Sequence, residues 1–312
     1  KTDISNFSDI RLVETDTIVN VLGDNFQITF NKKTGFLNDY VFSKRHIIQS
    51  ELIPHFWRAP TDNDRGNMMH IRTAIWKDIG KELNIKFFQR SLSKNVAKIK
   101  MVANHDPTGS VVTIKYNIFG NGLIDIEQEI VTEKESLPEL PRFGMKMTLP
   151  KDFNTVSWYG RGPHESYWDR KTSAPVKVYS GTVWEQTYPY VRPQETGNKT
   201  DVRWMALDNG TIGLLAIGQK LFDGSVHQYP YRDLENIPGD KRHGKLDIKP
   251  KNQVDWLIDY RQTGVGGDNS WGARTHQKYT LDGKSTNYKY HFYLIPFTKG
   301  VDIMDLSKIN MN

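Results

Sequence analysis

The strongest constraint on the fold is an alternation of apolar and polar residues with a repeat of two. Within Val111 to Ile118, apolar residues at every second position alternate with threonine, lysine and asparagine, which places one set on each face of a strand. The turn sequence Gly120-Asn121-Gly122 follows, and the alternation returns from Ile124 to Ile130. The two runs predict a β-hairpin with one face in the core.

Similar segments recur along the chain, separated by clusters of glycine, proline and asparagine. They are Phe26 to Phe30, Thr155 to Tyr159, Ile212 to Ile217 and Tyr288 to Leu294. Short strands without an intervening helical period favour sheets packed face to face, so we expect an all-β fold, one large antiparallel β-sandwich. The exception is Asn67 to Leu83, where a four-residue spacing of apolar side chains predicts one short helical segment. These side chains are Ile71, Ile75, Ile79 and Leu83.

Composition excludes several classes of function. The formal charge of +6 comes from 42 basic and 36 acidic residues mixed along the chain, whereas nucleic-acid sites cluster their basic residues, so we expect no nucleic-acid binding. A chain without cysteine has no disulfide and no thiolate metal site. The longest apolar stretch, Ile212 to Ile217, is far shorter than the roughly 20 residues that cross a bilayer, so we expect no membrane span.

The chain begins at Lys1 without a methionine, and the polar Thr2, Asp3 and Asn6 exclude the apolar centre of a signal peptide. We therefore expect a cleavage site or another boundary here, with any signal peptide lost. The compartment stays open between a bacterial cytoplasm and a periplasm.

A first unusual segment runs from Phe56 to Gly66 and contains Asp62, Asn63 and Asp64. Short acidic and amide side chains after a proline favour a tight, internally hydrogen-bonded turn. The alternative is a cation site, because hard cations take carboxylate and amide oxygens. A calcium loop of the EF-hand type needs a glutamate at its twelfth position, where this chain has Thr73, so the turn is favoured.

A second segment, Trp158 to Arg170, surrounds two glycines with aromatic rings, acids and arginines. Such a mixture fits a polar pocket, but it fits a structural hydrogen-bond network equally well. The neighbouring His164 and Glu165 are weak evidence for acid–base catalysis, because adjacent residues on a strand point to opposite faces.

A third segment, Gly264 to Gly272, combines closely spaced glycines with short polar side chains and carries Trp271 at its tip. An exposed indole can pack its face against the C–H groups of a sugar ring. On composition alone, a core tryptophan that caps the sandwich is the favoured alternative.

Together these segments carry a family resemblance. The runs RAPTDNDRG, WYGRGPHESYWDRK leading into YPYVRPQETGNKTDVRW, and VGGDNSW resemble, in this order, motifs of the C-terminal small-chain domain of the family 2 β-galactosidases. With FNKKTGFLNDY near the start, the resemblance extends from about Ile18 to about Phe297. It implies a supersandwich of the galactose mutarotase type. We expect a lead-in over residues 1–17, this domain over 18–300 and a tail over 301–312.

The resemblance also implies a division of labour. In full-length relatives, which hydrolyse terminal β-D-galactose residues, this domain follows a jelly roll, immunoglobulin-like sandwiches and a (β/α)₈ barrel that carries both glutamates needed for retaining hydrolysis. We therefore expect no catalytic residue, no metal site and no turnover in this chain alone. The magnesium and sodium that such enzymes use are expected in the barrel. The expected partners are galactoside sugars, the remaining domains and further copies of the enzyme in a homo-oligomer.

For individual residues, the resemblance makes Trp271 the aromatic platform for the substrate, which reverses the preference for a core tryptophan. Asp268 and Asn269 are further candidate sugar contacts. The expected organisers of the loops are Arg58, Asp62, Asn63, Asp64, Arg161, His164 and Glu165. The chain departs from the family at Thr61, where leucine is common, and at His164, where glutamine is common, and both differences bear on substrate preference.

Two other functions stay open at this point. One is a free-standing carbohydrate-binding module. The other is a mutarotase-like aldose epimerase, which needs its own acid–base pair on one concave face. The sequence offers His164, His227 and His243 for such a pair, together with Glu165.

Overall fold

The computed structural model describes residues 7–235, 241–284 and 286–309. The strands in chain order are β1 (Arg11–Glu14), β2 (Ile18–Leu22), β3 (Phe26–Asn31), β4 (Leu37–Phe42), β5 (Arg45–His46), β6 (Ser50–His55), β7 (Asn84–Ser93), β8 (Val96–His105), β9 (Ser110–Phe119), β10 (Ile124–Val131), β11 (Arg142–Pro150), β12 (Thr155–Arg161), β13 (Val176–Thr182), β14 (Lys199–Asp208), β15 (Ile212–His227), β16 (Gln253–Gln262) and β17 (Asn287–Thr298). The helices are short: α1 (Asp62–Gly66), α2 (Met69–Arg72), α3 (Gly244–Asp247) and α4 (Ile303–Leu306).

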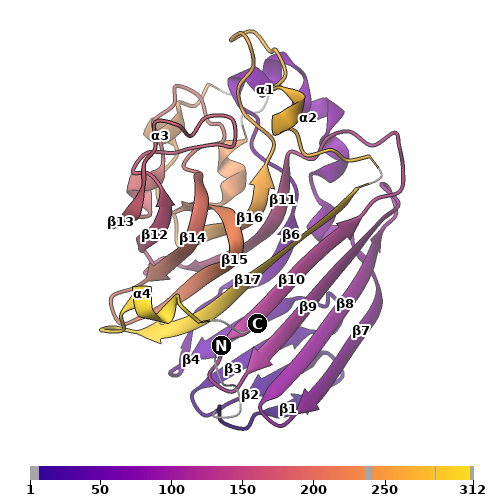
Figure 1. Cartoon of the computed structure of the whole chain (residues 1–312), viewed down its shortest axis with the longest axis vertical. Coiled ribbons are helices and arrows are strands. Elements are labelled where there is room, and N and C mark those ends of the chain that lie inside the picture. The colour runs from indigo at the N-terminus through magenta and orange to yellow at the C-terminus, as the bar shows by residue number, and fades with distance from the viewer. Residues whose placement is uncertain (1–6, 236–240, 285, 310–312) are drawn as a thin grey trace.

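The larger sheet contains the hairpin expected from the alternating sequence. β9 and β10 pair antiparallel with Tyr116 opposite Ile126, and β10 pairs on its other side with β17. Across the sheet the order is β13-β12-β14-β15-β17-β10-β9-β8-β7, and Figure 1 shows β7 to β10 and β17 side by side. The strands expected from the four other alternating segments are all present, as parts of β3, β12, β15 and β17.

β15 joins this sheet to a second group of strands. Its first half, Ile212 to Gly218, pairs with β17, whereas its last residues, Asp223 to His227, pair with β16. β16 in turn pairs with β11, and β11 with β6. Because β15 bends between the two pairings, the chain brings β16, and the loop that follows β16, to one end of the molecule (Figure 1).

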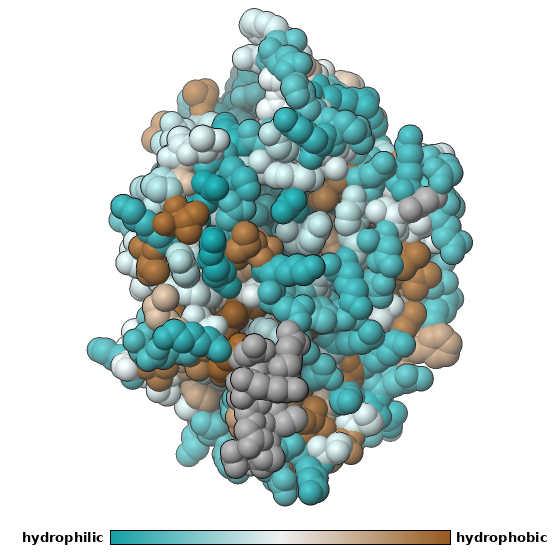
Figure 2. Space-filling view, viewed as in Figure 1, coloured by the Kyte–Doolittle hydropathy of each residue, from teal (hydrophilic) through white to brown (hydrophobic). Residues whose placement is uncertain are grey.

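The smaller sheet has the order β1-β2-β3-β4-β5 and packs against the larger one. Phe30 of β3 contacts Tyr116 of β9 edge to face, with ring centroids 4.9 Å apart, and both side chains belong to one continuous hydrophobic core. The large antiparallel β-sandwich that the sequence predicts is therefore confirmed. Hydrophilic side chains cover most of the face shown in Figure 2, and hydrophobic ones form small separate groups there.

The single helical segment expected within Asn67 to Leu83 is wrong in its detail. The chain forms α2 and two 3₁₀ turns, Ala74–Trp76 and Ile79–Lys81, instead of one continuous helix. Of the regularly spaced isoleucines, Ile79 is buried, whereas Ile71 is 61% exposed. Trp76, outside that spacing, supplies the buried anchor, because its ring packs against Phe56. None of the described helices is long and apolar enough to cross a membrane.

Candidate functional site

The glycine-rich loop after β16 presents Trp271 to solvent. The side chain is 87% exposed, the highest value among the large exposed hydrophobic residues of the described chain. In Figure 1 the loop rises beyond the ends of the strands, beside α1 and α2. The structure therefore does not place Trp271 in the core, the alternative favoured by composition alone.

The loop is shaped by its own polar side chains. The side-chain amide oxygen Oδ1 of Asn269 accepts hydrogen bonds from the backbone N–H of Trp271 at 2.9 Å and of Ala273 at 3.2 Å. Gly272 has φ of +109°, in the region that favours glycine. The exposed Asp268 carboxylate contacts the imidazole Nε2 of His276 at 2.7 Å. Asn269 thus forms the turn beneath the indole, while Asp268 lies at the loop surface.

Asn63 fastens the loop to α1. Its amide nitrogen donates to the carbonyl of Ala273 at 2.8 Å, and its amide oxygen accepts from the N–H of Gly272 at 2.9 Å. The approach is close at Gly66 as well, where an added Cβ would lie 2.8 Å from the carbonyl oxygen of Trp271. The RAPTDND segment therefore positions the tryptophan, although the two lie some two hundred residues apart in sequence.

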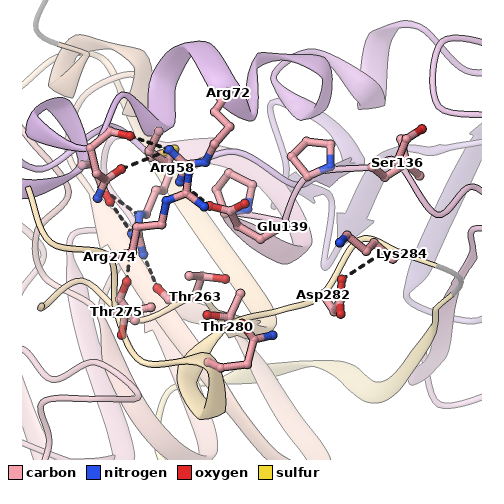
Figure 3. Close-up of a pocket in the computed structure, with 18 residues that line it drawn as sticks. Arg58, Arg72, Ser136, Glu139, Thr263, Arg274, Thr275, Thr280, Asp282 and Lys284 are labelled. Carbon is pink, nitrogen blue, oxygen red and sulfur yellow. Dashed lines mark hydrogen bonds and ion pairs between the residues drawn. The ribbon is translucent and has the colours of Figure 1, made fainter.

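Arg58 fixes the start of the same loop at Thr263 and Gly264, which we call the loop stem. Its guanidinium forms a two-bond ion pair with Asp64, with Nε–Oδ2 at 3.0 Å and Nη2–Oδ1 at 2.7 Å. It also donates to the carbonyls of Thr263 and Gly264 (Figure 3). Both side chains of the pair are at most 5% exposed, so the charges are held in a water-poor setting.

The segment after Arg58 forms the N-terminal cap and first turn of α1. Thr61 accepts from the N–H of Asp64 at 3.0 Å, and the Asp64 carboxylate accepts from the N–H of Thr61 at 3.0 Å, a reciprocal capping box. Asp62 points to the surface and exchanges two longer hydrogen bonds with Gln194. The expected local hydrogen bonding is present, and it takes the form of a cap to α1.

Asp169 anchors the loop as well, and sequence reasoning missed it. Its carboxylate accepts from the N–H groups of Val265 at 3.0 Å and Gly266 at 2.7 Å. The available signal was the acid in the motif SYWDRK and, far along the chain, the glycine-rich run Gly264 to Gly267, whose backbone N–H groups need acceptors. Nothing local connects the two segments, so the pairing is visible only in the fold.

The remaining motif residues hold neighbouring turns. Arg161 binds the Asp201 carboxylate and donates to the carbonyls of Lys171 and Ala174. Glu165 accepts from the Thr196 hydroxyl at 3.1 Å and the Gly197 N–H at 2.8 Å. Further bonds to Glu165 come from Arg170 and Tyr190.

The histidines proposed for an acid–base pair do not meet Glu165. His164 is exposed and contacts the Ser173 hydroxyl at 3.3 Å. His227 is fully buried beside Tyr229, and burial lowers its pKa to about 3. His243 contacts Asp247 at 3.7 Å. Within the described ranges, these three side chains lie in three separate settings.

A second ion pair lies deep in the sandwich next to the first. Arg142 contacts Glu195 at 3.2 Å and Asp259 at 3.2 Å, and all three side chains are inaccessible to solvent. Burial raises the pKa of Asp259 well above its usual value, and it raises that of Asp223, opposite on β15, to about 7. We call Arg58, Asp64, Arg142, Glu195 and Asp259 the buried charge cluster. Only Arg58 and Asp64 of this cluster were foreseen from sequence.

An open cavity of about 480 Å³ lies beside the loop stem. In Figure 3, Arg72 and Glu139 form an ion pair at its lining, and Asp282 and Lys284 lie at one edge. Arg274 from the loop completes a lining that carries charges of both signs. The stem is therefore bordered by polar surface instead of core.

The described residues offer no group of three or more histidine, cysteine or acidic side chains that could hold a metal ion. For the magnesium and sodium of full-length relatives, the resemblance implies sites in the barrel. The expectation that those ions bind outside this chain stays a prediction.

Comparison with known proteins decides the family. A family model described as the β-galactosidase small chain matches residues 22–294. The chain belongs to this family. A β-galactosidase of Priestia megaterium is 36% identical to this small-chain domain over 271 residues, which are 86% of this chain and 25% of that protein. The small-chain domain thus spans about a quarter of the length of the curated relatives that it matches.

Solved structures resemble the small-chain domain at low identity. A TPR-domain containing protein from Parabacteroides distasonis covers 95% of this chain with a TM-score of 0.55 at 10% identity, and the match spans 49% of that chain. This likeness concerns the fold alone. The match to a galactose 1-epimerase from Lactobacillus acidophilus covers 93% of this chain and 99% of that chain, with a TM-score of 0.49 at 7% identity.

Proposed function

We propose that this chain is the C-terminal domain of a retaining β-galactosidase, where it completes the sugar site for hydrolysis of terminal β-D-galactose residues. One observation carries the proposal: an indole that is 87% exposed stands on a loop fixed by Asn63, Arg58 and Asp169. A large aromatic ring on a polar loop loses the stabilisation of burial unless a ligand or a partner covers it. The names of the curated relatives support the choice of a galactoside.

The role of the domain is binding and orientation. Retaining hydrolysis needs two carboxyl groups about 5 Å apart, and we assign both to a barrel domain outside this chain. Trp271 offers an aromatic face to the C–H groups of a pyranose, most useful on the leaving-group side. Asp268, which is exposed at the same loop, can accept a hydrogen bond from a sugar hydroxyl, whereas the side-chain amide oxygen of Asn269 already holds the turn.

The same proposal extends to partners and cofactors. The remaining domains of the enzyme would cover the face around the loop, and further copies of the enzyme would form a homo-oligomer. Magnesium and sodium would bind to the barrel. The surface beside the loop stem supports contact with polar segments, because Arg72, Glu139, Arg274 and Lys284 line its cavity.

Two measurements test the proposal. The purified chain is expected to show no turnover of an aryl β-galactoside above background. In the full-length enzyme, Trp271→Ala is expected to raise KM about two- to twelvefold, because a stacking contact of about 0.5–1.5 kcal/mol is lost.

The matched control is Tyr188→Ala, which removes another exposed aromatic ring outside the loop and should leave KM unchanged. Turnover by the pure chain that disappears when one of its own acids is substituted would contradict the proposal. An unchanged KM in the Trp271→Ala enzyme would contradict the platform role.

A further inference from the structure

An open cavity of about 400 Å³ lies in the larger sheet where β15 leaves β17. The pairing of β15 with β17 ends at Gly218, and its pairing with β16 begins at Asp223. The three strands meet near the middle of the face shown in Figure 1. We call this space the split-sheet cavity; residues 219–222 of β15, Tyr260 of β16 and residues 289–291 of β17 line it. Its volume is within the range of about 300–1,000 Å³ that is usual for small-ligand sites.

A bulge in β15 forms one side of the split-sheet cavity. The residues between Ile217 and Phe222 face only Arg203 of β14, because the two flanking residues of β15 pair with residues just before and after Arg203. Gly218 permits this bend, since an added Cβ would lie 2.2 Å from the carbonyl oxygen of Lys220. Bulges redirect side chains and are frequent beside functional sites. The bulge thus releases these side chains from strand pairing and leaves them at the cavity.

Part of the lining is apolar and accessible to solvent. Leu221 is 44% exposed, and the Tyr260 side chain is partly exposed. The Tyr260 ring is held in place by contacts with the rings of Tyr288 and Tyr290, at centroid distances of 5.9 Å and 6.3 Å. A fixed aromatic ring and an exposed aliphatic side chain suit the C–H groups of a ligand ring.

The ionisable groups of the lining with a charge to offer are basic. Lys220 is exposed and forms no ion pair with any described residue. The side chains of Lys289 and His291 are 44% and 24% exposed, and both contact the Glu127 carboxylate. Lys115 contacts the same carboxylate at 2.7 Å, so one acid serves three bases. None of the described lining residues is acidic, so a ligand in the cavity meets a positive surface.

An anionic ligand suits this lining better than a neutral one. The unpaired ammonium group of Lys220 keeps its three N–H donors for a ligand, and charge-assisted bonds to an anion are stronger than neutral ones. The exposed Gln219 amide adds donors and an acceptor, which suit hydroxyl groups. A ligand with one anionic group, an apolar ring face and several hydroxyl groups therefore uses every part of the lining.

We propose that the split-sheet cavity binds an anionic sugar, a pyranose that carries one carboxylate, sulfate or phosphate group. Lys220 and Lys289 bind the anionic group, and Leu221 and Tyr260 contact the C–H groups of the ring. Gln219 forms a hydrogen bond with a ring hydroxyl. The site lies within the larger sheet, whereas the Trp271 loop follows β16, so this inference does not rest on the proposed function.

The test is calorimetric titration of this chain with D-galacturonate, D-galactose 6-sulfate and D-galactose 6-phosphate, beside D-galactose and inorganic phosphate. Saturable binding with one site per chain is expected for at least one anionic sugar, about tenfold tighter than for galactose or phosphate alone, because each of these lacks one set of contacts. Lys220→Gln should weaken that binding about tenfold, since a charge-assisted hydrogen bond is lost. Its melting temperature should stay the same, because Lys220 is exposed and unpaired among the described residues.

The matched control is Lys177→Gln, which removes the same charge from an exposed position on β13, outside the cavity. It should leave the affinity for the anionic sugar unchanged. Absence of saturable binding by all three anionic sugars would overturn the proposal. Equal affinities for the anionic sugar and galactose, equal affinities for the anionic sugar and inorganic phosphate, or equal affinities of the two lysine variants would overturn it as well.

Discussion

The Trp271 loop exposes a large aromatic side chain to solvent, whereas the buried charge cluster keeps charged side chains away from solvent. Trp271 is 87% exposed, whereas Arg58 and Arg142 are at most 1% exposed. Globular proteins usually show the reverse, because indoles are mostly buried and guanidinium groups mostly solvated. The exposed indole and the buried guanidinium are connected, since Arg58 donates hydrogen bonds directly to the stem of the Trp271 loop.

The comparison shows how a loop can hold a fixed shape without a hydrophobic core of its own. Side-chain bonds to backbone atoms hold it at several points, and one of the residues that supply them, Arg58, is itself fixed by a buried ion pair. The Arg58 bond to Gly264 spans 206 positions in the chain. The free energy of the fold is therefore expected to depend strongly on the cluster and weakly on the indole.

The largest expected effect follows from breaking the first ion pair. Arg58→Met leaves the Asp64 carboxylate buried without its partner, which should lower the free energy of unfolding by about 3–5 kcal/mol. Arg192→Met is the matched control, because its contact with Asp62 is 4.0 Å long and solvent-exposed, and it should change stability by less than about 0.5 kcal/mol. Equal urea midpoints for the two variants would contradict the larger contribution of the buried ion pair to stability.

The second effect concerns pH. Burial raises the pKa of Asp223 to about 7 from a reference value of 3.8. A raised pKa means that the protonated form favours folding, so this contribution is present below pH 4 and is lost as the pH rises towards 7. Asp223→Asn should therefore stabilise the chain at pH 8 by up to about 4 kcal/mol and give little gain at pH 3.

Asp16→Asn, a substitution at an exposed acid, serves as its control and should show no such difference between the two pH values. Urea unfolding at both pH values is the measurement. A gain from Asp223→Asn that is the same at pH 3 and pH 8 would contradict burial as the cause.

A smaller effect is expected at the contact between α1 and the loop. In Gly66→Ala the new Cβ would lie 2.8 Å from the carbonyl oxygen of Trp271, so the loop must shift, at a cost of about 1–3 kcal/mol. Gly181→Ala is the control, because its Cβ would meet only the far ends of Glu185 and Gln186. A crystal structure of each variant would show whether Trp271 moves in the first and stays in place in the second. If the loop does not move in Gly66→Ala, the close contact between α1 and the Trp271 loop would be contradicted.

The strands could be predicted from the sequence, because they depend on a local alternation of apolar and polar residues. The alternation around Tyr116 and Ile126 predicts β9 and β10 because side chains on a strand alternate between its faces. The bonds of Asp169 to Val265 and Gly266 were invisible because no periodicity links residues about a hundred positions apart. The single helical segment expected within Asn67 to Leu83 was wrong in its detail, because α2 ends at Arg72 and two short 3₁₀ turns follow, which bury Trp76 as well as Ile79.

The most direct test is the free energy of unfolding of Trp271→Ala, measured beside that of Trp256→Ala in the same denaturant series. Trp256 is fully buried on β16, and its truncation should cost about 3–5 kcal/mol. If Trp271 serves a ligand or a neighbouring domain instead of the fold, its truncation should change stability by less than about 0.5 kcal/mol. A loss of several kcal/mol in Trp271→Ala, comparable with that of Trp256→Ala, would contradict the account.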